Sequence, residues 1–115
     1  MFALNFQAAY HEEMLRNRTK NCTVRLGDVR DTYPENSIVW VTFGKKQCPR
    51  QKLYRAIIDK VRVKHFSQLT AEDLAHQNPN IKTVDELIAD FEQLYRRSIT
   101  PEDYVSVVYF SEIID

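Results

Sequence analysis

The run Ile38–Phe43, with the sequence IVWVTF, most constrains how this chain folds. All six residues are β-branched or aromatic, a composition that favours a β-strand over a helix. Because the run is almost continuously apolar, we expect a strand that is buried on both faces of a sheet. Trp40 lies inside it, and we expect its indole to belong to the core rather than to stack on a nucleic-acid base.

Three further segments have strand patterns. Asn21–Leu26 and Tyr104–Phe110 are short β-prone runs, and Gln51–Phe66 is either one long strand or two bent ones. Over Asp59–Lys64 charged residues alternate with valines, the pattern of a strand with one wet face. The cations that share this wet face are Lys60, Arg62 and Lys64. They suit either a sheet edge protected by lysines or contacts with RNA phosphates.

The N-terminal segment has helical spacing. We expect Asn5 to cap a helix that runs to about Arg16, with Tyr10 and Met14 four residues apart on one side. Asn17 follows, and it suits a left-handed residue that ends the helix.

Two more helices are expected in the acidic second half of the chain. Thr70 begins a short helix that runs to about His76. Thr83-Val84-Asp85-Glu86 fits the capping-box pattern and precedes a clear apolar stripe, so a helix to about Arg96 is expected.

The order of these elements predicts an α+β fold, because strands distant in sequence bracket the helices. The sheet is expected to be small, strongly twisted and barrel-like, although the sequence leaves barrel closure open. At 115 residues the chain is long enough for one core, so residues 1–115 are expected to form one domain.

Charge is distributed unevenly along a chain whose net charge is zero. Residues 1–66 contain 13 Lys and Arg against 6 Asp and Glu, whereas residues 67–115 contain 3 against 10. Separated charge of this kind can create a basic face for a polyanion such as RNA. The alternative is that the two halves interleave in space and their fields cancel.

Several classes of protein are disfavoured by the sequence. No apolar run approaches the roughly 20 residues of a membrane span, and the N-terminus lacks the basic and apolar regions of a secretory signal. Two cysteines, Cys22 and Cys48, fit a reduced, cytoplasmic protein and are too few for a zinc site. We expect no metal or cofactor and no membrane partner. The sequence does not define the oligomeric state, and we expect a monomer.

The candidate site lies in the stretch Arg16–Asp28, RNRTKNCTVRLGD. Strand alternation sends the apolar residues Cys22, Val24 and Leu26 to one face and the polar residues Asn21, Thr23 and Arg25 to the other. The Cα atoms of Thr23 and Arg25 are then roughly 6–7 Å apart. Such a donor-rich face suits an anionic or amide-bearing ligand. The alternative is a half-exposed edge strand with a solvated arginine.

The segment Lys20–Arg25 has the pattern K-x-x-T-x-R, follows an amphipathic helix and opens a strand. In this it resembles the ASCH-domain family of PUA-like proteins. The similar order of elements covers almost the whole chain, including the LTAEDL turn and a closing strand that ends in Val-Tyr-Phe. The resemblance implies a small mixed β-barrel with flanking helices, a pocket beside the motif strand and an association with RNA.

One function implied by the resemblance is an RNA- or nucleoside-binding module. Lys20, Thr23 and Arg25 would lie in the pocket. The other residues expected to contact the ligand or its phosphates are Arg18, Asn78, Lys45 and Lys46. Lys20 and Thr23 have opposite parity in a strand, so they converge only if Lys20 lies in the bend before the strand.

The alternative function is an amidohydrolase that removes the acetyl group from N4-acetylcytidine. The resemblance then implies that Thr23 is the nucleophile, that Lys20 is its base and that a later Glu completes the site. That Glu should fall near Asn78 or Asn80, and the chain has no carboxylate between Asp73 and Asp85. Asn cannot transfer a proton as a carboxylate does, so binding is preferred. A ribonuclease ranks last, because the sequence offers no His pair or metal cluster for it.

Overall fold

The computed structural model describes residues 2–45 and 48–114. Lys46, one of the residues expected to contact phosphates, lies outside the described residues. The strands of the described part are β1 (Ala3–Phe6), β2 (Cys22–Leu26), β3 (Ile38–Phe43), β4 (Gln51–His65) and β5 (Tyr104–Glu112). Its α-helices are α1 (Ala9–Arg16), α2 (Ala71–Gln77) and α3 (Val84–Tyr95), and a short 3-10 helix, Phe66–Gln68, follows β4.

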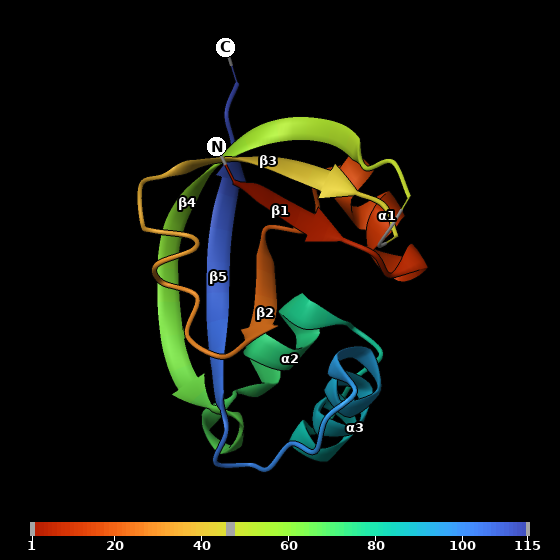
Figure 1. Cartoon of the computed structure of the whole chain (residues 1–115), viewed down its shortest axis with the longest axis vertical. Coiled ribbons are helices and arrows are strands. Elements are labelled where there is room, and N and C mark those ends of the chain that lie inside the picture. The colour runs from red at the N-terminus through yellow and green to blue at the C-terminus, as the bar shows by residue number, and fades with distance from the viewer. Residues whose placement is uncertain (1, 46–47, 115) are drawn as a thin grey trace.

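The strands form one mixed sheet in the order β1-β3-β4-β5-β2. β1 is parallel to β3, and the other neighbours are antiparallel. The long strand β4 arches over the molecule (Figure 1), and a register shift between Ile58 and Lys60 marks an irregularity in its pairing with β5. The sheet is a strongly curled half-barrel, because no ladder joins its edge strands β1 and β2 in the described part. The predicted α+β class and twisted, barrel-like sheet are confirmed.

Two apolar clusters make up the core. The first packs α1 against β1, β3 and β4 and includes Leu4, Leu15 and Val41. The second packs α2 and α3 against β2 and β5 and includes Val24 and Phe91. In Figure 1 α2 lies beside the lower end of β2, and α3 lies below and to the right of α2. β2 therefore lies at the boundary between the curled sheet and the layer formed by α2 and α3.

The predicted N-terminal helix is wrong in its first half. Residues Ala3–Phe6 form β1, and the helix begins only at Ala9. The Asn5 side chain does not cap a helix, because its amide nitrogen donates to Gly44 O over 3.0 Å. The physical reason is pairing with the adjacent edge of β3, which four residues of weak local preference cannot reveal. The left-handed residue after α1 is Arg18, with φ of 65°, rather than Asn17.

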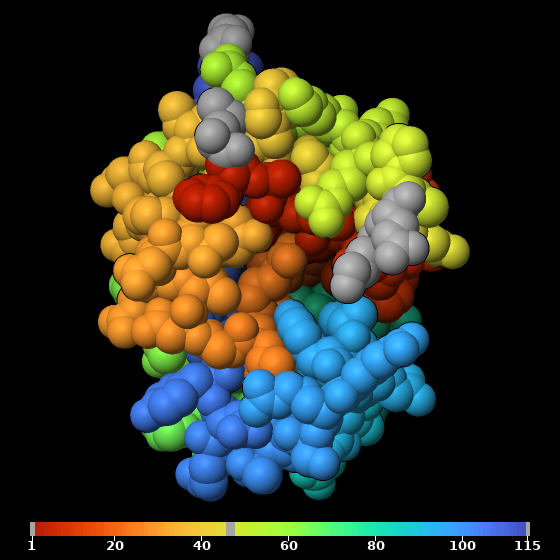
Figure 2. Space-filling model, viewed as in Figure 1, coloured from red at the N-terminus to blue at the C-terminus, as the bar shows by residue number. Residues whose placement is uncertain are grey.

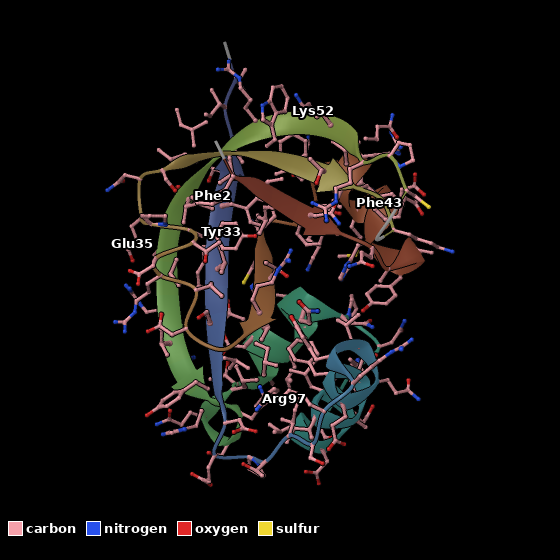
Figure 3. All side chains as sticks on the ribbon, viewed as in Figure 1. Phe2, Tyr33, Glu35, Phe43, Lys52 and Arg97 are labelled. Atoms are coloured by element: carbon pink, nitrogen blue, oxygen red, sulfur yellow. The ribbon has the colours of Figure 1, made fainter. Side chains whose placement is uncertain are left out.

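The strand Ile38–Phe43 is confirmed, but its predicted burial on both faces is wrong. Val39 and Val41 are buried, whereas Ile38 is 43% exposed. Trp40 is only partly buried, so its predicted place in the core is also wrong. Lys52, labelled in Figure 3, lies with its ammonium 4.9 Å from the centre of the indole ring. The Trp40 indole is therefore covered in part by a long cationic side chain.

The later helices begin where their capping residues predict. Thr70 and Thr83 accept hydrogen bonds from the backbone N–H groups of Asp73 and Glu86. Gln51–His65 is one continuous strand, with Lys60 and Arg62 exposed as the alternation predicts. Lys64 differs, because it is half-buried in an ion pair with Asp73 at 2.7 Å. None of the helices described is long and apolar enough to cross a bilayer.

Candidate functional site

A cleft of about 360 Å³ opens at the seam of the half-barrel, where β1 and β2 face one another. The C-terminal end of α2 and one side of α3 complete its walls. Figure 2 shows the surface hollowed where β1 (red), β2 (orange) and α3 (light blue) meet. Residues from these elements that line the cleft include Phe6, Tyr10, Thr23, Arg25, Gln77 and Tyr95.

At this seam, side chains rather than a neighbouring strand form the hydrogen bonds of the backbone groups on the free edges of β1 and β2. On β2, the N–H of Val24 donates to Gln77 Oε1 over 2.9 Å. On β1, the carbonyl of Asn5 accepts from Arg25 Nη2 over 2.9 Å, and that of Ala3 accepts from Tyr33 Oη over 3.1 Å. Tyr33 reaches β1 from the loop that crosses β4 and β5, as its label in Figure 3 shows. Because side chains bridge the edges, the seam stays open enough to hold a ligand.

Arg25 spans the seam without an acidic partner. Its guanidinium lies 4.8 Å from the centre of the Phe6 ring, and one N–H bonds to the Asn5 carbonyl. No carboxylate in the described part of the chain forms an ion pair with it. Burial lowers the pKa of Arg25, yet a guanidinium remains charged at all ordinary pH values. Its other N–H groups are therefore donors for an anionic or carbonyl group in the cleft.

Thr23 and Gln77 form the floor of the cleft. Thr23 Oγ1 lies 3.1 Å from Gln77 Oε1, which also accepts from the backbone N–H of Val24. A backbone N–H can only donate, so the Gln77 atom that it meets is the oxygen. Thr23 therefore donates its own proton to that oxygen, and the hydroxyl lone pairs remain as acceptors.

Lys20 lies behind this floor rather than in the cleft. It occupies the bend before β2, and its side chain is buried. The ammonium donates to the carbonyls of Cys22 over 2.7 Å, His76 over 2.6 Å and Gln77 over 3.3 Å. These three acceptors match the three N–H groups of an ammonium. Burial lowers the pKa of Lys20 to about 7. Of the three motif side chains, Thr23 and Arg25 meet in the cleft, and Lys20 secures the end of α2 beneath them.

The other expected contacts lie apart from one another. Arg18 does not line the cleft; its Nε lies 3.0 Å from Glu112 and its guanidinium 4.1 Å from the Tyr54 ring centre. Asn78 is buried and is not among the residues that line the cleft; it follows Gln77, which does line it.

Lys45 is exposed in the segment that follows β3 and is not among the residues that line the cleft. It directly follows Gly44, whose N–H donates to the carbonyl of Phe6 over 3.0 Å. Phe6 lines the cleft, so the chain at Lys45 is tethered to the cleft wall. An ammonium there can meet a phosphate that enters with a ligand.

Comparison with solved structures identifies the architecture. A crystal structure of an ASCH domain from Lactobacillus crispatus superimposes with a TM-score of 0.66 at 10% identity, covering 96% of this chain and 77% of that one. The chain has the ASCH-domain fold. A DUF984-family protein from Enterococcus faecalis matches this fold with a TM-score of 0.62 at 12% identity, over 88% of this chain and 68% of that one.

A protein from Pyrococcus furiosus, solved by NMR, also has the ASCH-like fold. Its TM-score is 0.59 at 14% identity, over 99% of this chain and 98% of that one. No family model matches the sequence, and no curated protein is significantly similar to it. The similarity is therefore one of fold, and the cleft must be interpreted from its own residues.

Three residues of this cleft were not predicted. Gln77 lies just beyond the point, about His76, where we expected the second helix to end, and Asp90 lies on α3. His11 is buried, and its Nε2 lies 2.9 Å from the carbonyl of Gln77. Burial and the nearby Lys20 lower the pKa of His11 to about 4, so the ring is neutral and its Nε2–H donates. Only the tertiary fold brings these residues together, and no spacing in the sequence signals them.

The described residues contain no candidate metal site. No cluster of three or more His, Cys, Asp or Glu side chains within them could hold a metal ion. Cys22 is buried, and burial raises the pKa of its thiol to about 11. A thiol of this kind is a core side chain rather than a nucleophile.

Proposed function

We propose that the protein binds RNA and takes an unpaired nucleoside into the cleft between β1, β2 and α3. The observation that carries the proposal is the partly buried guanidinium of Arg25, which lines the cleft and has no carboxylate partner among the described residues. A charge held in a partly buried wall is costly unless a group of complementary polarity meets it. A base carbonyl or a phosphate of RNA is such a group.

The mouth of the cleft suits a planar base. Tyr10 and Tyr95 line it and are 40% and 39% exposed, and Leu94 beside them is 57% exposed. Single-stranded RNA is recognised chiefly through bases that leave the stack and lie on aromatic side chains. Such stacking contributes about 1–3 kcal/mol per base. Two exposed tyrosines above a polar floor therefore favour a base over a small inorganic anion.

A direct test measures binding of a fluorescently labelled single-stranded RNA by anisotropy at several salt concentrations. We expect the wild-type affinity to fall steeply with salt, and Arg25→Gln to weaken it by about tenfold or more. Arg62→Gln is the matched control, since Arg62 is exposed on β4, does not line the cleft and lies 3.5 Å from Glu35, which is labelled in Figure 3. Wild-type protein that fails to bind RNA, or binds it without salt dependence, contradicts the proposal.

Amidohydrolysis of an acylated nucleoside is the second candidate. Burial lowers the pKa of Lys20 to about 7, as a base for Thr23 would require, and Asp90 brings a carboxylate to the same cleft. Two contacts favour binding instead: Thr23 donates its proton to an amide oxygen, and the Lys20 ammonium faces three carbonyls. The test is incubation with N4-acetylcytidine. Release of cytidine that disappears in Thr23→Ala would favour hydrolysis.

A further inference from the structure

We infer that the cleft selects uracil, through a donor–acceptor–donor set formed by the Gln77 amide nitrogen, the Thr23 hydroxyl and the Arg25 guanidinium. The inference rests on the proposed binding of a nucleoside in this cleft. It adds the identity of the base, which follows from the direction of each hydrogen bond in the floor.

Gln77 supplies the first donor. Its side chain is 5% exposed, and Oε1 is held by two donors, the Val24 N–H and the Thr23 hydroxyl. This orientation leaves the NH2 group on the other side of the amide, and no acceptor among the described residues bonds to it. No side-chain nitrogen that is fully buried in the described structure lacks a partner. The Gln77 NH2 group therefore keeps some exposed surface, and Gln77 is one of the residues that line the cleft.

The end of α2 keeps this donor in place. The backbone carbonyl of Gln77 accepts from His11 Nε2 over 2.9 Å and from Lys20 Nζ over 3.3 Å. Both donors come from segments packed beneath the helix end. Gln77 is thus fixed through its backbone by two contacts and through its side chain by two more, and a preorganised donor discriminates better than a mobile one.

Thr23 supplies the acceptor and Arg25 the second donor. The Thr23 proton is committed to Gln77, so only its lone pairs face a ligand. Thr23 is bonded to Gln77 and lies two residues from Arg25 on the same face of β2, which makes its hydroxyl the middle member of the set. Arg25 has N–H groups beyond the one that bonds to the Asn5 carbonyl.

A donor–acceptor–donor set is complementary to an acceptor–donor–acceptor edge. Uracil presents such an edge, with the O4 carbonyl, the N3–H and the O2 carbonyl in succession. Cytosine has an amino donor in place of O4 and an unprotonated ring nitrogen in place of the N3–H. It would therefore place a donor against the Gln77 donor and an acceptor against the Thr23 acceptor. A site built to hydrogen-bond one edge rejects the other because its own polar groups would be left unpaired.

The test compares oligouridylate and oligocytidylate of equal length at one salt concentration, so that phosphate contacts are the same. We expect oligouridylate to bind about fivefold to a hundredfold more tightly. An oligonucleotide of 3-methyluridine, which lacks the N3–H donor, should lose this advantage in the wild-type protein. Gln77→Glu keeps one oxygen for Val24 and Thr23 and replaces the amide donor by an acceptor, so the preference should fall or reverse toward cytidine.

The outcomes separate the two proposals. Equal binding of both oligonucleotides, or a preference for cytidine, overturns the assignment of uracil and leaves RNA binding intact. Binding of neither oligonucleotide overturns both proposals. Full affinity for the 3-methyluridine oligonucleotide also overturns the assignment, and this measurement requires no variant to fold.

Discussion

The hydroxyl of Thr23 donates its proton to Gln77 Oε1 over 3.1 Å, and the direction of this bond decides what Thr23 can do. An amide oxygen is a weak base, so the contact does not activate the hydroxyl as a nucleophile. It leaves the oxygen lone pairs as an acceptor within a cleft of about 360 Å³. The same pair of residues therefore favours recognition of a ligand over attack on it.

Thr23→Val removes the hydroxyl and keeps the β-branched shape that suits β2. We expect binding of oligouridylate to weaken by about tenfold, since the middle acceptor is lost, and unfolding free energy to fall by about 1 kcal/mol. Thr23→Ser should retain most of the affinity. Calorimetric titration and denaturant unfolding measure the two effects. Undiminished affinity in Thr23→Val would mean that the hydroxyl does not contact the ligand.

Tyr10→Ala should lower affinity for single-stranded RNA by about fivefold to a hundredfold, as expected for loss of one stacked base. Tyr10→Phe should bind as the wild type does, because the ring and not its hydroxyl is required. Tyr104→Ala is the control: Tyr104 is 55% exposed and stacks on His65, and it does not line the cleft. Equal losses in Tyr10→Ala and Tyr104→Ala would place the base elsewhere.

Those elements that could be predicted from the sequence are the ones with strong local patterns. β3 and the long strand β4 follow from β-branched runs and alternation, and α3 follows from a capping threonine and an apolar stripe. β1 has no such pattern. Ala3–Phe6 becomes a strand because it pairs in parallel with β3, a long-range contact that no local window contains.

The candidate site was predictable only in part. Alternation along β2 correctly sends the Val24 side chain to the core, and Thr23 and Arg25 line the cleft together with Val24 itself. The direction of the Lys20 side chain depends on carbonyls at the end of α2, 56 and 57 residues away in sequence. Gln77 reaches the site because the same end of α2 packs against β2. Tertiary contacts of this range leave no trace in residue spacing.

Lys45→Ala should reduce the salt dependence of RNA binding without changing base preference. Lys45 is exposed and directly follows Gly44, which bonds to Phe6 of the cleft wall. Each phosphate contact on single-stranded RNA contributes about 0.7 to the slope of log affinity against log salt. The slope should therefore fall by about that amount. Lys60→Ala is the control, because Lys60 lies on β4 with its ammonium 5.1 Å from the Tyr109 ring centre, away from the cleft. An unchanged slope in Lys45→Ala would exclude a phosphate contact at this residue.

Lys20→Met should destabilise the fold strongly. The buried ammonium joins the Cys22 carbonyl of β2 to the last two carbonyls of α2, and an apolar side chain would leave these three acceptors without their lysine donor. We expect a loss of about 3 kcal/mol in unfolding free energy, measured by urea titration. Lys82→Met, which removes an exposed contact with the Pro79 carbonyl, should cost less than about 0.5 kcal/mol. Similar values for the two variants would mean that Lys20 does not hold the helix end.

Because of His11, the free energy of unfolding should fall as the pH is lowered from 6.5 to 4. In the fold the pKa of His11 is lowered from 6.5 to about 4, so in this range the unfolded chain binds a proton that the folded protein excludes. Stability rises with pH wherever the unfolded state binds more protons, and one histidine contributes at most about 1.4 kcal/mol per pH unit. Asp28 and Asp73, whose pKa values lie below 3.8, lose their contributions only at lower pH.

His11→Gln separates this effect from the rest of the titration. A glutamine can still donate to the Gln77 carbonyl, as His11 does over 2.9 Å, but it has no proton to gain. Urea unfolding at intervals between pH 4 and pH 7 should show a smaller slope for the variant than for the wild type, with similar stability at pH 7. Parallel pH profiles for the two proteins would mean that the pKa of His11 is the same in the folded and the unfolded chain. The ring that donates to the Gln77 carbonyl would then not be held in its neutral form.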